Sequence, residues 1–253
     1  MRFGPRPLFA WALFLSPAAW AQVPTGPAFQ VNTYTTDRQR APQAVLHSNG
    51  DFVVVWDSFE QYLVTPSDVF ARRFTPSGSG IGAEFRVNDF TTSAQDVLGA
   101  RAISLDARGN AIVAWSDFRS GVDVFPPRLP AGGTPAGEDF RVNQVTPGSQ
   151  GLGGVARAPD GRFVVVWNDF PGYDVFARRF DAGGTPVGDE LRVNTNTTNR
   201  HIDPVVGIDR AGNFTVVWDD RDGTGLGEIL GQRFGPSGER VGAEFTVNSY
   251  TTG

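Results

Sequence analysis

The hydrophobic residues of this chain lie in short runs that recur along most of its length. Residues 52–56 and 163–167 are apolar at every position, which is typical of a strand whose two faces are both covered. Residues 85–88 instead alternate between apolar and polar side chains, as expected for a half-exposed strand. Glycine-containing turns separate the runs. This pattern predicts β-strands throughout and an all-β fold.

The strand signals repeat with a nearly constant period. An aromatic residue or Leu, any residue, Val and Asn form a tetrad that occurs five times, and a single Trp stands between successive tetrads. The tetrads end at Asn32, Asn88, Asn143, Asn194 and Asn248, and the Trp residues are Trp56, Trp115, Trp167 and Trp218. The steps from Asn to Asn are 56, 55, 51 and 54 residues. Such a period indicates a repeat architecture, with repeats at about 33–88, 89–143, 144–194 and 195–248.

Each repeat carries signals for four strands, A to D. A Gly six residues before each Trp predicts the hairpin between strands A and B, and a Gly-rich turn predicts the hairpin between C and D. Strand C begins at an acid and has an Arg five residues later. The acids are Asp68, Asp123, Asp174 and Glu228, and the arginines are Arg73, Arg128, Arg179 and Arg233. We therefore expect four four-stranded antiparallel sheets.

Four such sheets, with strand B covered on both faces and strand D exposed, are typical of β-propeller blades. A parallel β-helix fits less well because its rungs are shorter than these repeats. The sequence holds five D strands for four A-B-C sets, so we expect an open or imperfectly closed array. The first D strand, residues 29–32, should then lie beside the first repeat or at a free edge, outside the fourth blade.

One repeat resembles a known kind of sequence. The second repeat reads Trp115, Asp117, Arg119, Gly121, Asp123 and Phe125, followed by Arg128 and the tetrad that ends at Asn143. This pattern resembles the blades of TolB-like and other extracellular propellers in bacterial secreted and cell-surface proteins, and the resemblance covers nearly all of residues 28–253. The resemblance implies a propeller fold and a secreted or cell-surface location, and it carries no catalytic residues. Pro126 and Pro127 depart from it and should distort strand C.

The first 21 residues have the features of a signal peptide. Arg2 and Arg6 precede an apolar stretch at 8–15, and small residues flank Trp20 before an expected cleavage site at Gln22. We therefore expect a secreted, periplasmic or cell-surface domain at 22–253, with no membrane span. Cysteine is absent, so packing alone must hold the fold. The net charge of −5 argues against nucleic acid as a partner.

The connections between strands B and C vary in length and are rich in acids. The candidate binding residues there are Asp117, Arg119, Asp123, Asp169, Asp174, Asp219, Asp220 and Asp222. Several carboxylates in one loop can supply ligands for calcium, but no loop matches a known calcium motif. The competing interpretation is a solvated loop together with an acid–Arg ion pair within each strand C. No catalytic motif is found, and no other cofactor is expected.

We interpret the chain as a secreted binding module without catalytic activity, which recognises a protein or a glycan through the B–C loop face. One alternative is a structural surface repeat within a longer array, with further repeats or a homo-oligomer covering its ends. The other is a carbohydrate-active hydrolase. An enzyme should have unique polar residues in one irregular repeat, and only the loop at 56–68, with Glu60 and Tyr62, is irregular.

Overall fold

The computed structural model describes residues 26–59, 61, 67–89, 94–97, 101–117, 121–129, 139–222 and 227–249, without the side chains of 121–129. The first sheet contains β1 (Gln39–Leu46), β2 (Phe52–Ser58), β3 (Asp68–Phe74) and β4 (Gly80–Arg86). The second contains β5 (Gln95–Asp96), β6 (Ile103–Leu105), β7 (Ala111–Asp117), β8 (Gly121–Leu129) and β9 (Phe140–Arg141). The third contains β10 (Ser149–Arg157), β11 (Phe163–Phe170), β12 (Val175–Phe180) and β13 (Leu191–Arg192). The fourth contains β14 (Arg200–Ile208), β15 (Phe214–Arg221), β16 (Gly227–Phe234) and β17 (Phe245–Thr246).

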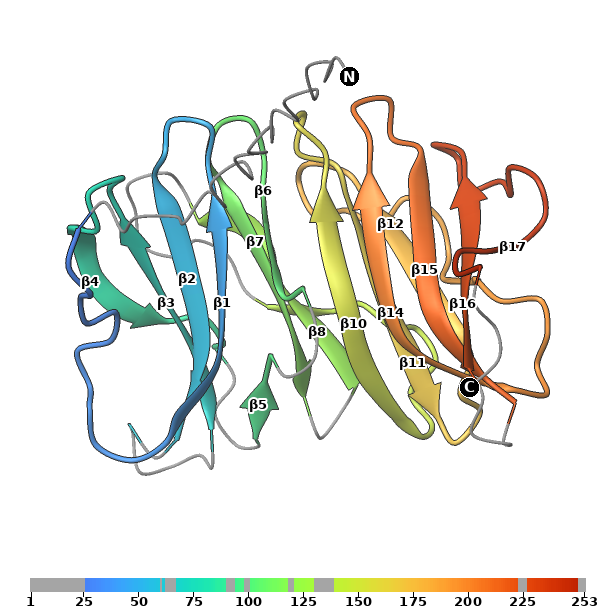
Figure 1. Cartoon of the computed structure of the whole chain (residues 1–253), viewed down its shortest axis with the longest axis horizontal. Coiled ribbons are helices and arrows are strands. Elements are labelled where there is room, and N and C mark those ends of the chain that lie inside the picture. Colours follow the sequence, from blue (N-terminus) through green and yellow to red (C-terminus); the bar gives the residue numbers. More distant parts are fainter. Residues whose placement is uncertain are drawn as a thin grey trace, which may run out of the picture.

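The four sheets follow one another in chain order and do not close into a ring. Each sheet is antiparallel, with its strands hydrogen-bonded in sequence order from the inner strand to the outer one. Figure 1 shows the first sheet at one end of the row and the fourth at the other. The inner strand of the second sheet is divided into β5 and β6, which both pair with β7. The predicted all-β, open array of four-stranded repeats is confirmed.

The core lies between neighbouring sheets, because strand B is apolar on both faces. In β11, Val165 and Trp167 belong to the cluster shared with the second sheet, whereas Val164 and Val166 belong to the cluster shared with the fourth. All four repeat Trp side chains are buried, with exposed fractions between 0 and 3%. They occupy equivalent positions in their sheets, but Trp115, Trp167 and Trp218 pack between neighbouring sheets, whereas Trp56 lies against residues 29–32 at the end of the array.

The inner strands are crowded where they approach one another. Gly153 in β10 lies so close to Pro204 in β14 that a Cβ there would clash with the Pro204 carbonyl oxygen.

The two prolines of β8 distort its pairing with β7, as expected. The register of this pairing shifts between Ala111 and Val113, opposite Pro126 and Pro127, because proline lacks the N–H that the ladder needs.

The Asn of each tetrad holds the start of strand C. The Asn194 side chain accepts a hydrogen bond from the Val175 N–H at 2.8 Å and donates one to Asp174 at 2.6 Å. Asn88 makes the same contacts with Val69 and Asp68, both at 2.8 Å. The expected acid–Arg pair within strand C is therefore wrong where the side chains are described. Residues five apart on a strand point to opposite faces, and the arginines reach the next sheet instead.

Residues 29–32 lie over the outer face of the first sheet, as expected. The Phe29 ring packs 5.4 Å from that of Phe74 and 6.3 Å from that of Phe52. The predicted signal peptide, Arg119, Glu60 and Tyr62 lie outside the described residues. In the part of the chain that the structure describes, no helix is long and apolar enough to cross a membrane.

Candidate functional site

A cleft of about 260 Å³ opens where the inner strands begin, between the second and third sheets. Its walls come from the ends of β5 and β7, the start of β10, the end of β11 and the middle of β14. The lining residues are Asp96, Ser116, Asp117, Ser149, Gln150, Gly151, Leu152, Asn168, Phe170 and Asp203. Three carboxylates, two hydroxyls, two side-chain amides and one aromatic ring thus face a single space.

Strand register places these groups together. The start of each inner strand pairs with the residue two positions after the repeat Trp, as in Gln95 with Asp117 and Gln150 with Asp169. The acids that follow the Trp therefore stand at the same end of neighbouring sheets. Asp203 reaches this end by another route. It lies in a bulge between Ile202 and Val205, where the ladder shifts register, and bulges redirect side chains.

Two buried carboxyl groups and a half-buried arginine lie beside the cleft. Arg40 Nε is 3.4 Å from Asp57 Oδ2, and Arg40 Nη2 is 3.9 Å from Asp96 Oδ2. The Val97 N–H donates to Asp57 Oδ1 at 2.9 Å. Burial raises the pKa of Asp57 to about 7, and the nearby Asp96 charge adds to this, whereas Arg40 and the Val97 hydrogen bond oppose it. Asp57 and Asp96 therefore form a pair of neighbouring carboxyl groups.

The fourth sheet carries a related arrangement. His201 takes the place of Gln150 at the start of the inner strand and is fully buried. Its Nε2 lies 3.6 Å from Asp220 Oδ1, and its Nδ1 lies 3.9 Å from Asp174 Oδ1. Nδ1 is also within 3.1 Å of the Tyr173 carbonyl oxygen. These contacts join the third and fourth sheets.

The structure distributes the predicted binding residues among several places. Asp117 lines the cleft, and Asp169 lies beside it, accepting a hydrogen bond from the Asp174 N–H at 2.8 Å. Burial raises the pKa of Asp169. Asp219 pairs with Arg221 at 2.6 Å, and Asp222 is exposed.

Two of the remaining predicted residues need separate comment. Asp123 lies in β8, and the structure does not describe its side chain. Asp220 does not fit the competing interpretation of a solvated loop, because it is only 8% exposed and packs against His201.

Sequence reasoning missed the residues that complete the cleft and its neighbouring charge cluster. Asp57, Asp96 and Asp203 lie on strands instead of the variable loops, so a search of the B–C loops did not find them. One signal was available. The position seven residues after each tetrad Asn holds Gln39, Gln95, Gln150 and His201, which marks the start of each inner strand.

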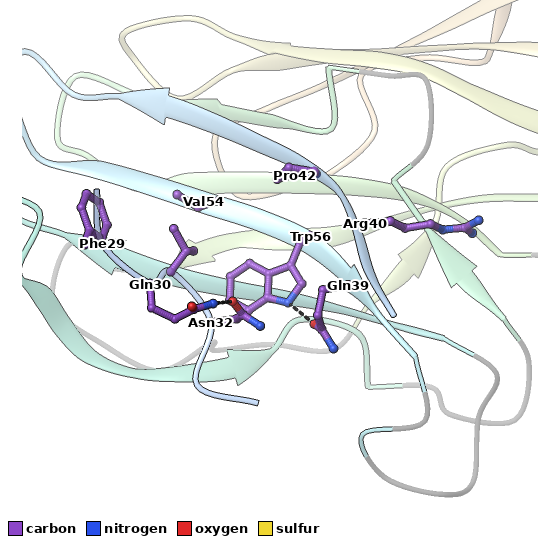
Figure 2. A pocket seen from close by; sticks show the side chains of 9 residues that line it. Phe29, Gln30, Asn32, Gln39, Arg40, Pro42, Val54 and Trp56 are labelled. Carbon is purple, nitrogen blue, oxygen red and sulfur yellow. Dashed lines mark hydrogen bonds between the residues drawn. The ribbon is translucent and has the colours of Figure 1, made fainter. Parts of the chain in front are cut away.

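A second cavity of about 310 Å³ lies at the end of the array, over the outer face of the first sheet. Figure 2 shows Val54 and Trp56 beside Phe29, Gln30 and Asn32, with Gln39 and Arg40 on the other side of Trp56. Trp56 Nε1 donates to Gln39 Oε1 at 2.9 Å. This cavity contains no carboxylate, unlike the cleft. Among the described residues, no group of three or more His, Asp or Glu side chains could hold a metal ion.

Comparisons with known proteins identify the fold. No family model matches the chain. No curated protein matches it either. The Hadza microbial sialidase is similar in structure, with a TM-score of 0.55 and 12% identity over 85% of this chain and 47% of that one. The Penicillium chrysogenum α-L-arabinanase, complexed with arabinobiose, has a TM-score of 0.50 and 17% identity over 87% of this chain and 70% of the enzyme.

The chain thus spans about half the length of the sialidase that it matches. The predicted β-propeller type of fold is supported by both structures. Our prediction of a binding module without catalytic activity is contradicted, because the similar structures are named as enzymes that act on glycans. The hydrolase alternative agrees better with these comparisons than our main interpretation does.

Proposed function

We propose that this protein is a carbohydrate-active hydrolase that cleaves a glycan in the cleft between the second and third sheets. The observation that carries the proposal is the meeting of Asp96, Asp117 and Asp203 in one cleft with amides, hydroxyls and a ring. Glycoside hydrolysis needs two carboxyl groups at the scissile bond, one protonated and one ionised.

The neighbouring charge cluster supplies the protonated group. Asp57 and Asp96 both lie near the Arg40 guanidinium. Two adjacent carboxyl groups resist simultaneous ionisation because their negative charges repel each other. Because the pKa of Asp57 is raised to about 7, this pair holds a proton near neutral pH. Asp57 is fully buried, whereas Asp96 lines the cleft. We assign Asp96 as the group that meets substrate and Asp57 as its positioning residue.

The reaction then needs a base, and Asp117 lies in the same cleft on β7, the strand that pairs with β5. In this assignment, the proton held by Asp57 passes to Asp96 and from Asp96 to the glycosidic oxygen, as the bond from that oxygen to the sugar breaks and Asp57 is left ionised. The Asp117 carboxylate takes a proton from the attacking water, so that hydrolysis consumes one water and leaves two hydroxyl groups.

The remaining lining residues suit a sugar. Gln150 and Asn168 offer amide donors and acceptors to sugar hydroxyls, as Ser116 and Ser149 do with their hydroxyls. Phe170 presents an apolar ring at the end of β11, against which a sugar ring can pack. The acidic cleft favours a neutral substrate over an anionic one. A polysaccharide of neutral pentoses or hexoses therefore fits the cleft better than a sialylated glycan.

The cellular setting belongs to the same proposal. A leader at residues 1–21 would export the domain at 22–253, and a blade pattern of the TolB-like type is typical of that compartment. A polysaccharide outside the cytoplasm is then the accessible substrate.

Release of reducing ends from arabinan, galactan and a sialylated glycan tests the proposal. We expect the wild type to act on a neutral polymer, and Asp96→Asn and Asp117→Asn each to reduce the rate by roughly 100-fold or more, as loss of an acid or base does. Asp57→Asn should shift the pH profile of the rate, which loss of fold alone would not do.

Asp160→Asn is the matched control. Asp160 is exposed in the hairpin between β10 and β11, at the opposite end of the third sheet, where it pairs with Arg162 at 2.8 Å. This variant should keep the wild-type rate, and thermal unfolding should show that all variants are folded. A wild type inactive on every polymer, or full activity in Asp96→Asn and Asp117→Asn, would overturn the proposal.

A further inference from the structure

The sheets of this protein meet through one contact that recurs at every junction. The backbone N–H that follows each of the first four tetrad Asn residues donates to an acid in strand D, or just before it, of the next sheet. These pairs are Thr33 with Glu84, Asp89 with Asp139, Gln144 with Glu190, and Thr195 with Glu244, at 2.5 to 3.2 Å. Ser249 holds the fifth such position, at the exposed end of the fourth sheet.

The apolar part of each junction is equally regular. The tetrad residues Val87, Val142 and Val193 are at most 1% exposed, whereas Val247 is 53% exposed. Strand C shows the same contrast, because Val175 is fully buried and its fourth-sheet equivalent, Ile229, is 36% exposed. The fourth sheet therefore presents to solvent a surface that the other sheets bury. We call this surface the terminal face, and it also includes Val205 and Phe245.

The arginines of strand C cross the same junctions. Arg73 donates to the Gly109 carbonyl oxygen of the second sheet at 3.1 Å, and Arg179 donates to Pro236 of the fourth at 2.8 Å. Their fourth-sheet equivalent, Arg233, lies over the Phe245 ring at 5.8 Å. Arg233 also lines a wide cavity of about 610 Å³ on the terminal face. The fourth sheet thus carries the residues that form one side of a junction, but no sheet packs against them among the described residues.

The first sheet carries the residues that form the other side of a junction. Arg72 donates to the Val31 carbonyl oxygen at 2.9 Å, just as Arg178 in the third sheet donates to Val142 at 2.7 Å. Residues 29–34 thus act on the first sheet as the outer strand of a preceding sheet would. They replace only that one strand, and the cavity of about 310 Å³ over Trp56 lies where the other strands of a neighbour would stand (Figure 2).

We propose that the terminal face docks on the first sheet of a second copy of this chain. The second copy is the occupant because its first sheet carries the arginine, acid and aromatic residues that receive such a face at the internal junctions. Residues 245–248 and 29–32 share the Phe-x-Val-Asn sequence, so they compete for one place on that sheet. Two copies joined head to tail at both ends would close a ring of eight sheets, within the usual range for propellers.

Burial of an exposed apolar surface supplies the driving force, and this inference does not depend on the proposed hydrolysis. Light scattering with size-exclusion chromatography gives the mass of the purified chain over a range of concentrations. We expect a dimer, and Val247→Asp should weaken association by roughly tenfold or more. Val187→Asp is the control, because Val187 is also exposed, at 43%, but lies beside the third sheet. A monomer at all concentrations would overturn the proposal.

Disulfide trapping tests the head-to-tail geometry, since the chain has no cysteine of its own. A mixture of Ser249→Cys and Glu84→Cys chains should form a covalent heterodimer, because these positions match the recurring N–H-to-acid contact. A mixture of Ser249→Cys with Glu190→Cys should not, since Glu190 lies at the junction that the second and third sheets of one chain already form. Dimers trapped only between two Ser249→Cys chains, or open polymers in place of dimers, would contradict the closed ring.

Discussion

At the scale of single residues, the recurring positions serve the junctions between sheets. The tetrad Val is buried there, and the tetrad Asn fixes the start of strand C through Asp68 or Asp174. The acid–Arg pair was mispredicted from spacing alone, although strand geometry already excludes it. Asn and Asp lie 20 residues apart in the chain, so only the return of strand D beside strand C reveals their contact.

Asp57 should make stability depend on pH. Its folded pKa is raised to about 7, above the unfolded value, so the folded protein binds more protons than the unfolded chain between about pH 4 and 7. Stability should therefore fall as pH rises through that window, by at most about 1.4 kcal/mol for each pH unit from this group. Below it, both states are protonated and the effect is constant.

Urea unfolding at several pH values measures this contribution. Asp57→Asn cannot ionise, so the difference in unfolding free energy between variant and wild type should grow in favour of the variant from pH 5 to pH 7. Parallel profiles for the two proteins would show that burial of Asp57 does not raise its pKa.

At the scale of strands and sheets, periodicity predicted most of the fold. Strand B is apolar on both faces and lies between two sheets, and the hairpin glycines lie where the left-handed conformation is needed, as at Gly161 with φ of +100°. The division of the second inner strand into β5 and β6 was not predictable, because it depends on how that strand meets its neighbours. The cleft escaped prediction for the same reason, since Asp96 and Asp203 meet only through the packing of different sheets.

The contribution of each repeat Trp to stability should depend on how completely a neighbouring sheet packs against it. Trp167 is packed between the second and third sheets, so Trp167→Ala should reduce the free energy of unfolding by about 3–5 kcal/mol. Trp56 occupies the same position in the first sheet but borders an existing cavity. Trp56→Ala should therefore cost less, because part of its surroundings is already empty. Denaturant unfolding of both variants makes the comparison, and equal losses would contradict it.

At the scale of the whole molecule, the protein is a linear stack with unequal ends. Each inner sheet is stabilised by two junctions. Among the described residues, the fourth sheet packs on the third alone, and the first is covered partly by residues 29–34. In such arrays, stability is approximately a sum of repeat and nearest-neighbour terms. The loss of one junction should therefore act locally on the sheet that lacks it.

Hydrogen exchange should report this inequality. In the monomeric Val247→Asp variant, we expect amides of β15 and β16 to exchange roughly tenfold or more faster than those of β11 and β12, because sub-global opening releases the least supported unit first. β15 and β16 occupy the same places in the fourth sheet as β11 and β12 do in the third, so a difference in exchange rate does not come from a different position in the sheet. In the wild type, a second copy on the terminal face would restore the missing junction and slow exchange in β16 as concentration rises. Equal protection in the third and fourth sheets of the variant would show that the stack unfolds as one cooperative unit, with no local term for its open end.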